Sequence, residues 1–418
     1  MSAASASLVA LLLAIALSFG TRVNVGVAAI ALAFVLGLVF PGGQSEAVAG
    51  AFPASLFLTL LGVTVLFATS EANGTLARLA ERAVRLARGD ARVVPWLLFL
   101  VAFGVAAVGP GAVSSVALVA PLGAAVSAQL GFSPFLGALM VANGANAGNL
   151  SPLSAVGIIA NSRMAEAGLA GYEAKVFAAN AIAHVAVTAA AYAVWLWRRP
   201  PAASTEARSL IPAASQPLDA MQQLTVTVIA LWALGVIVLR LPVGLSAMAG
   251  VVLLLAFQAA DEAATLRRTP WGAILMVSGM STLVGLAEKS GGIKLFSGLL
   301  ARFATPASAN GVMAFVTGAI STYSSTSGVV LPTFLPTVPD FVARLGGGDP
   351  LAISLSINVG SSLVDVSPLS TLGALCVAAV ADAETARSLF RRLMAWGLSM
   401  TLVGALLSQL LAGPLARL

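Results

Sequence analysis

The chain has 418 residues, of which 59% are hydrophobic and 9% are charged, and its formal net charge is +6. A soluble domain carries about 25% charged residues, so a chain this apolar cannot cover itself against water and its main solvent must be lipid. The positive charge is typical of Lys and Arg gathered in loops of a membrane protein, not of a nucleic-acid-binding surface. The single cysteine, Cys376, excludes an internal disulfide and a thiolate metal cluster.

Long apolar runs follow one another along the chain and predict membrane-spanning helices, because strands of a β-barrel would alternate apolar and polar residues. The predicted apolar segments are 5–20, 23–40, 53–70, 93–108, 113–130, 133–161, 174–197, 221–239, 242–259, 270–286, 311–321, 327–342, 350–380 and 389–415. No basic residue precedes the first segment, which is therefore predicted to be a true span and not a cleavable signal peptide. We expect an all-α polytopic membrane protein.

The two halves of the chain repeat one another on either side of a linker rich in Pro, Ala and Ser, at 198–220. The matching positions are 149–157 with 365–373 at an offset of 216, Gly62, Glu71 and Gly74 with Gly279, Glu288 and Gly291 at an offset of 217, and 22–26 with 240–244 at an offset of 218. The first pair shares an identical Ser-Pro-Leu-Ser core and the following glycine. A near-constant offset predicts an internal duplication.

Each half is predicted to hold three scaffold helices, a re-entrant hairpin, a broken helix and one further span. Five true spans per half is an odd number, so the second repeat is expected to be inverted relative to the first. The predicted units are 1–92 (scaffold and arm), 93–197 (hairpin and transport helices), 198–220 (cytoplasmic linker), 221–304 (scaffold and arm) and 305–418 (hairpin and transport helices). With both termini outside, 14 of the 22 Lys and Arg residues fall on the inner side of a bacterial-type inner membrane.

Two pairs of short segments are predicted to be the re-entrant hairpins. Segments 93–108 and 113–130 are joined by an uncharged turn, and segments 311–321 and 327–342 are joined by an uncharged, hydroxyl-rich one. Short apolar segments interrupted by Gly or Pro, at corresponding positions of two halves, point to a transporter binding site. The alternative is an ordinary pair of short spans with a tight turn.

Segments 133–161 and 350–380 each carry a polar stretch with a proline in the middle of an apolar span. Proline prevents a regular helix, and polar groups in hydrocarbon cost free energy unless they are paired or hydrated. The stretches therefore predict broken helices, whose freed carbonyls suit Na⁺ and whose half-helix N-termini suit an anion. The alternative role is helix packing through small residues, which accounts at least equally well for Gly144, Gly148 and Gly360.

Ionisable residues within the spans are few. Asp365 is the counterpart of Asn149 in the first half, and it is predicted to be a Na⁺ ligand or a proton carrier, with a helix cap as the alternative. His184 is predicted to be a packing residue with one hydrogen bond, with a proton relay as the alternative. Glu71 and Glu288 lie at equivalent span ends and are predicted to be solvated. They precede amphipathic arms, of which 75–92 is expected to lie on the inner leaflet.

The order of these elements in both halves resembles the ion transporter superfamily. Within it, residues 57–67, 73–76 and 146–159 resemble the MatC-like dicarboxylate carriers, which are permeases of the divalent anion:sodium symporter type. The resemblance covers nearly the whole chain. It implies a homodimer in which a transport domain moves against a fixed scaffold, an elevator motion.

Related symporters carry a Ser-Asn-Thr motif at each hairpin tip, whereas here the tips read Val113-Ser-Ser-Val116 and Ser324-Ser-Thr-Ser327, without the asparagine. The resemblance implies substrate-binding roles for Ser114, Ser115, Asn149, Ser151, Ser325, Thr326 and Ser367. It implies ion-binding roles for Ser114, Asn146, Asn149, Ser327, Ser362 and Asp365, with Na⁺ held at the hairpin tips and broken helices.

We therefore predict symport of a small dicarboxylate of the malonate, succinate or malate class, with Na⁺ (or H⁺) as coupling ion, no organic cofactor and no nucleic-acid partner. Neither motif contains Lys or Arg, so dipoles, hydroxyls, amides and bound Na⁺ would meet the substrate's charge. A cation/proton antiporter or inorganic oxyanion exporter of the same fold is the alternative. An intramembrane enzyme is disfavoured because the sequence shows no Ser-His-Asp spacing, HExxH motif or paired mid-span carboxylates. A structural protein would leave the duplicated polar breaks unexplained.

Overall fold

The computed structural model describes residues 2–20, 23–39, 44–85, 92–130, 132–198, 217–322, 324–380 and 382–418. Over these ranges every regular element is a helix, which confirms the all-α prediction. The first half comprises α1 (Ala3–Gly20), α2 (Val25–Val39), α3 (Gln44–Ala51), α4 (Ala54–Ala72), α5 (Thr75–Arg85), α6 (Val94–Val108), α7 (Gly111–Leu130), α8 (Pro134–Gly148), α9 (Ala155–Glu166) and α10 (Glu173–Arg198).

The second half repeats this order. It comprises α11 (Ala220–Leu239), α12 (Val243–Ala256), α13 (Glu262–Arg268), α14 (Trp271–Lys289), α15 (Gly292–Ala301), α16 (Ala309–Ser321), a π-helical turn η2 (Thr326–Val330), α17 (Leu331–Phe334), η3 (Leu335–Thr337), α18 (Val338–Leu345), α19 (Pro350–Leu363), η4 (Val364–Val366), α20 (Thr371–Ala378) and α21 (Ala383–Arg417). Prolines at 332, 336 and 339 divide the second arm of the hairpin into these short pieces.

Helix length and composition support a multi-pass membrane protein. Among the described residues, four helical stretches are long and apolar enough to cross a bilayer: Ala54–Ala72, Glu173–Trp197, Pro350–Ala378 and Glu384–Arg417. Eight further apolar helices have 10–17 residues. The first arm of the predicted first hairpin, α6, is among the short ones, whereas its second arm, α7, has 20 residues.

Two short helices were not predicted from the sequence, α3 and α13. Helix α13 is polar, so it contains no apolar run that would predict it. It is capped at its start by Asp261, whose carboxylate accepts the Ala264 N–H at 2.7 Å. Of the predicted arm at 75–92, residues 75–85 form α5 and 86–91 lie outside the described residues. Most of the predicted linker, 199–216, also lies outside them, and α11 begins at a capping box formed by Asp219 and Gln222.

The scaffold is held by two helix crossings that the duplication relates. Helix α2 crosses α14 where Gly26 meets Gly279, and α4 crosses α12 where Gly62 meets Gly244. A Cβ at Gly62 would collide with the carbonyl of Gly244, and one at Gly279 with the carbonyl of Gly26. The repeat offsets equate Gly26 with Gly244 and Gly62 with Gly279. The two crossings are therefore equivalent contacts, each between corresponding glycines of the two repeats. Small residues allow this backbone approach in membrane proteins.

The other helices form a second body around the two broken spans. Helix α8 packs on α6, with Gly144 and Gly148 against the carbonyls of Phe99 and Phe103. Gly360, the equivalent of Gly144, packs α19 against the backbone of α16. These contacts favour the packing role for the three glycines.

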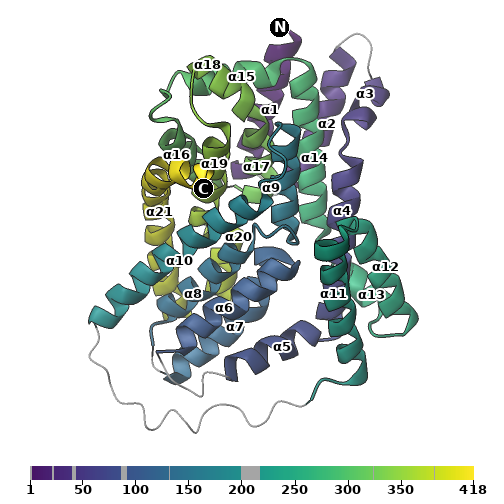
Figure 1. The fold of residues 1–418 in the computed structure, drawn as a ribbon, viewed down its shortest axis with the longest axis vertical. Coiled ribbons are helices and arrows are strands. Elements are labelled where there is room, and N and C mark those ends of the chain that lie inside the picture. Colours follow the sequence, from purple (N-terminus) through teal and green to yellow (C-terminus); the bar gives the residue numbers. More distant parts are fainter. Residues whose placement is uncertain are drawn as a thin grey trace.

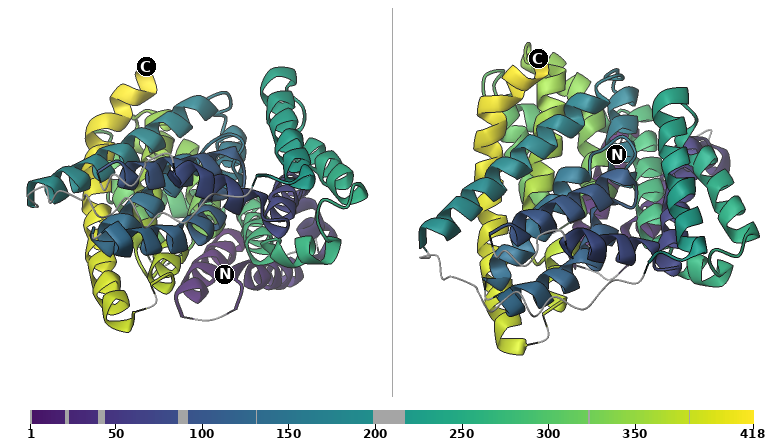
Figure 2. Two further views of the ribbon diagram at one scale, coloured as in Figure 1. Left: turned by 90° about the horizontal axis from the view of Figure 1, so that it is seen from below. Right: turned by 60° about the horizontal axis from the view of Figure 1, so that its bottom comes forward.

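Figure 1 shows the scaffold helices α11–α13 on one side of the molecule and α16 and α21 on the other, with α9, α17 and α20 between them. The arms α5 and α15 lie at opposite ends of the molecule, as two inverted repeats require. In Figure 2, α11 and α12 project from the remaining helices.

Candidate functional site

Both predicted breaks are present. Helix α8 ends at Gly148 and α9 begins at Ala155, with turns at 149–154 between them. In the second half α19 ends at Leu363, and a 3₁₀ turn and a bend separate it from α20, which begins at Thr371. The prediction of interrupted helices is therefore confirmed at both positions.

The Ser-Pro-Leu-Ser motif closes each break by local hydrogen bonds. In the first, Ser154 N–H donates to the Ser151 carbonyl at 2.9 Å, and the Ser154 hydroxyl donates to the carbonyl of Asn149. The same two contacts recur in the second break between Ser370, Ser367 and Asp365. The Ser-Pro-Leu-Ser motif is therefore shared by the two repeats because its serines form the hydrogen bonds of the turn in each break.

The glycine that follows each motif is part of the same turn. A Cβ at Gly157 would collide with the carbonyl of Ser151, and one at Gly373 with the carbonyl of Ser367. The hydroxyls of Ser151 and Ser367 accept backbone N–H groups two residues on, each at 3.3 Å. Both serines were predicted to bind substrate, and the structure places their hydroxyls within the turns.

The tip between α6 and α7 docks on the first break. Gly111 adopts a positive φ of 79°, which turns the chain so that the next amide, Ala112 N–H, donates to Asn149 Oδ1 at 2.9 Å. Ala155 N–H, at the start of α9, donates to the Gly109 carbonyl at 3.2 Å. Asn149 therefore holds the tip through its side chain.

The tip between α16 and η2 docks on the second break in the equivalent way. The Thr326 hydroxyl donates to Asp365 Oδ2 at 2.8 Å and also lies close to the Ser321 hydroxyl. Ser325 accepts the Gly328 N–H at 3.0 Å and so shapes the tip. The two docking contacts have the same place in each repeat, but one uses a neutral amide and the other a carboxylate. That the two tips belong to re-entrant hairpins stays a prediction.

A cavity of about 370 Å³ lies where both tips and both breaks meet. Six of the predicted site residues line it: Ser114, Asn149, Ser325, Thr326, Ser327 and Asp365. The first two residues of α9 and the first two of α20 also line it. The positive dipole ends of two half-helices therefore face the cavity from opposite repeats.

Five predicted site residues do not line the cavity: Ser115, Asn146, Ser151, Ser362 and Ser367. The buried Ser115 hydroxyl donates to the Ala102 carbonyl of α6 at 2.7 Å, which fixes the two arms of the hairpin to each other. Asn146 and Ser362 lie behind the breaks, where Asn146 Nδ2 donates to the Ser362 carbonyl at 3.2 Å.

The remaining wall comes from the scaffold and was missed from the sequence. It comprises Val25, Leu60, Thr64, Pro270, Ile274, Met276 and Val277. Most of these are apolar residues in apolar helices, so their sequence gives no signal. Thr64 is the exception, because a hydroxyl residue in an apolar span is a signal that the sequence offers. Its side chain donates to the Leu60 carbonyl at 2.7 Å.

Glu71 was predicted to be solvated, but the structure places its side chain against the first tip, largely buried. Its carboxylate accepts a hydrogen bond from Ser114 at the first tip, and the charge of Arg268 acts on it from α13. Thr64, Phe67 and Pro110 complete a small cavity of about 10 Å³ around this group. The scaffold therefore touches the first tip through a polar contact. His184 is fully buried, and its Nδ1 lies 2.9 Å from the Asn180 carbonyl.

The charged groups that line the main cavity are few. Among its described lining residues Asp365 is ionisable, and none is Lys or Arg. Hydroxyls, carbonyls and one carboxylate can coordinate a monovalent cation, whereas the two half-helix N-termini offer a positive potential to an anion. The cavity thus has ligands for a cation and an anion side by side.

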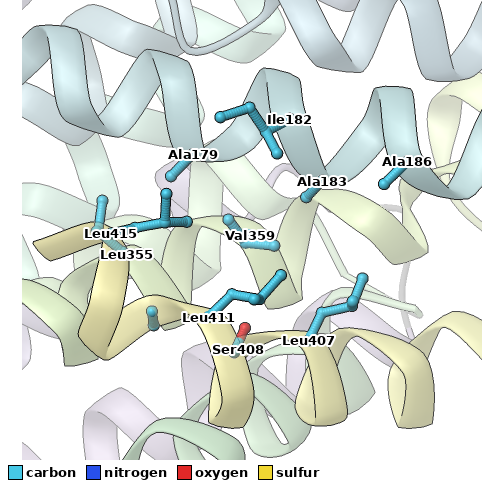
Figure 3. Close-up of a pocket in the computed structure, with 11 residues that line it drawn as sticks. Ala179, Ile182, Ala183, Ala186, Leu355, Val359, Leu407, Ser408, Leu411 and Leu415 are labelled. Atoms are coloured by element: carbon cyan, nitrogen blue, oxygen red, sulfur yellow. The ribbon is translucent and has the colours of Figure 1, made fainter. Parts of the chain in front are cut away.

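Figure 3 shows a different cavity, of about 40 Å³, where Ile182 of α10 faces Val359 of α19 and Leu411 of α21. Apart from Ser408, its described lining residues are apolar. Such a lining suits hydrocarbon and cannot hold a small ion.

Two comparisons with known proteins agree with this architecture. Residues 1–149 match the family model described as "Dicarboxylate carrier protein MatC N-terminus", which confirms the resemblance over that range. The crystal structure of the YdaH transporter of Alcanivorax borkumensis, described as having an unusual topology, matches with a TM-score of 0.57 at 15% identity. The match covers 93% of this chain and 96% of that one. The comparison with curated proteins gives no match. The fold is that of a membrane transporter, and both matches are to transport proteins and not to enzymes.

Proposed function

We propose that the protein is a secondary active transporter that couples Na⁺ to the symport of a small dicarboxylate, of the malonate, succinate or malate class. The observation that carries the proposal is the meeting of two helix breaks, each docked by its own tip, around one cavity. The match of residues 1–149 to a dicarboxylate carrier family supports the choice of substrate.

Na⁺ coupling follows from the charges around the cavity. A dicarboxylate entering a site whose described lining residues include Asp365 and no basic side chain meets net repulsion. Two bound Na⁺ reverse this, because one neutralises Asp365 and the second adds positive charge next to the substrate. We assign the ion to Asp365, Ser327 and the carbonyls of the second break, and a second ion to Ser114 and Asn149 at the first.

The substrate carboxylates are assigned to the half-helix N-termini. The positive dipole ends at the starts of α9 and α20 face the cavity from two sides, which suits an anion with a charge at each end. The hydroxyls of Ser114, Ser325 and Thr326 complete the polar surface between them. This arrangement needs no Arg.

The transport step is proposed to be an elevator motion in a homodimer embedded in the inner membrane. One wall of the cavity comes from scaffold helices α2, α4 and α14, and the others come from the tips and breaks. A site divided in this way becomes accessible from the other side when the body that carries the tips slides along the scaffold wall.

Thermal stabilisation of purified protein tests the substrate class. A small dicarboxylate should raise the melting temperature in NaCl and not in choline chloride, because both ligands bind the folded state together. At a hundredfold excess over Kd, binding stabilises by about 2.7 kcal/mol, a shift of a few degrees. Monocarboxylates and sulfate serve as controls. If no dicarboxylate stabilises the protein in either salt, the lone carboxylate favours the cation/proton antiporter instead, and proton counterflow would identify it.

The adjacent serines of the first tip provide a matched pair of variants. Ser114→Ala removes a cavity hydroxyl and is expected to weaken Na⁺-dependent uptake about tenfold, the usual effect of one hydrogen bond. Ser115→Ala removes the bond to the Ala102 carbonyl and is expected to cost stability, about 1 kcal/mol, with transport retained. Uptake and melting temperature are measured for both. Equal loss of uptake in the two variants would contradict the assignment.

A further inference from the structure

The main cavity has a polar side and an apolar side, and the two sides belong to different parts of the molecule. Among its described lining residues, every polar side chain except Thr64 lies on the two tips, the two breaks or the start of α20. Thr64 lies on the scaffold helix α4, and its hydroxyl donates to the Leu60 carbonyl at 2.7 Å. Because the one proton of this hydroxyl is already used, the scaffold side offers no side-chain hydrogen-bond donor to a substrate.

Three large apolar side chains remain uncovered on the lining of this cavity. Val113, beside Ser114 on the first tip, is 50% exposed, and Leu369, within the second break, is 44% exposed. Met276 of the scaffold helix α14 is half-buried and lies against the second tip, where a Cβ on Gly328 would meet its side-chain atoms at 2.6–2.7 Å. Apolar surface in contact with water is unfavourable, so a ligand that covers these side chains gains affinity.

Behind Met276 the scaffold side is closely packed. Leu60, Ile274 and Val277 line it and are almost fully buried, at 2%, 2% and 1% exposure. Packed side chains of this kind have little freedom to move. Met276, in contrast, is unbranched, and its thioether adapts to ligands of different shape. The scaffold side therefore presents one adaptable apolar side chain on a fixed apolar support.

The size of the cavity leaves room beyond the dicarboxylate itself. Its volume of about 370 Å³ is larger than malonate or succinate fills. Cavities of this size typically hold ligands with an apolar body that a few polar groups orient. A dicarboxylate bound between the starts of α9 and α20 leaves space next to Met276, and water in that space would find no side-chain donor on the scaffold side.

We propose that the substrate is a small dicarboxylate that carries an alkyl group on its carbon chain, and that Val113, Leu369 and Met276 receive this group. The carboxylates keep their places at the half-helix N-termini, and the alkyl group points to the scaffold. Each methylene that leaves water should tighten binding about fourfold. The inference rests on the proposed function, because it specifies the substrate of the same site.

Isothermal titration calorimetry of the purified protein in NaCl compares succinate with its C-methyl and C-ethyl derivatives. The dissociation constant should fall about fourfold with each added carbon, and the heat-capacity change of binding should become more negative because apolar surface is buried. Butyrate has an alkyl chain but only one carboxylate, and it serves as the control for apolar binding alone. It should bind more weakly than succinate.

Two variants test the side chains that the inference names. Val113→Thr replaces a methyl group by a hydroxyl of similar size, and Met276→Gln replaces the thioether by an amide. In each, the ratio between the dissociation constants of succinate and its C-ethyl derivative should fall several-fold from the wild-type ratio of about 16. Val108→Thr is the matched control, because Val108 is 38% exposed and does not line the cavity. Its ratio should equal that of the wild type.

The possible outcomes separate this inference from the proposed function. If succinate binds in NaCl and its alkyl derivatives bind no more tightly, the inference is overturned and the proposed function stands. A wild-type ratio in both Val113→Thr and Met276→Gln, or butyrate that binds as tightly as C-ethyl succinate, also overturns the inference alone. If neither succinate nor its derivatives bind, the proposed function is refuted together with the inference.

Discussion

Asp365→Asn should abolish Na⁺-driven accumulation of dicarboxylate and leave the fold intact. Asp365 is the one ionisable group among the described lining residues of the main cavity, and it holds the second tip through Thr326. Loss of a charged partner costs about 1.5–3 kcal/mol, which lowers cation affinity about 10- to 100-fold. Asparagine still accepts the Thr326 hydroxyl, as Asn149 accepts an amide in the first repeat, so docking should survive. Uptake into proteoliposomes under an inward NaCl gradient measures the effect.

Asp340→Asn provides the control for this variant. It makes the same chemical change on α18, at a residue that does not line the cavity. Its uptake should match that of the wild type, and both variants should melt near the wild-type temperature. Unchanged Na⁺ dependence in Asp365→Asn would remove this carboxylate from the coupling mechanism.

Gly62→Ala should strongly destabilise the scaffold. The added Cβ runs into the Gly244 carbonyl, which is backbone and cannot move without separating α4 from α12. Overpacking of this kind costs about 1–3 kcal/mol. The equivalent crossing of α2 with α14 is a separate contact and does not reduce this cost. Lower yield of monodisperse protein and a lower melting temperature in detergent are the expected results.

Gly104→Ala is the matched control, because a Cβ on that residue of α6 meets nothing within 4 Å. Alanine favours helix over glycine by about 1 kcal/mol, so this variant should melt at or above the wild-type temperature. A melting temperature of Gly62→Ala equal to that of Gly104→Ala would contradict the close crossing of α4 and α12.

The helix breaks could be predicted because their cause is local. A proline and a run of amides and hydroxyls inside an apolar span are incompatible with a continuous helix, and the duplication supplied the same evidence twice. The all-α architecture follows from the same reading, whereas the docking of each tip on its break emerged only from the structure. The glycine after each Ser-Pro-Leu-Ser core was recognised as matched, and its reason, contact with the carbonyl of Ser151 or Ser367, emerged only from the packing.

Which hydroxyls face the cavity could not be predicted. Ser114 and Ser115 are adjacent and identical in kind, but the helix direction points one at the cavity and the other at α6. The contact of Glu71 with Ser114 depends on how α4 meets the first tip, which no local pattern specifies.

The central claim is that one cavity between the two breaks binds a dicarboxylate together with Na⁺. Cryo-electron microscopy of the protein with succinate, in NaCl and separately in choline chloride, examines this claim at the site itself. We predict anion density between the starts of α9 and α20 and ion density beside Asp365 and Thr326, both present in NaCl and absent in choline. Succinate density outside this cavity, or density equally strong in both salts, would contradict the account.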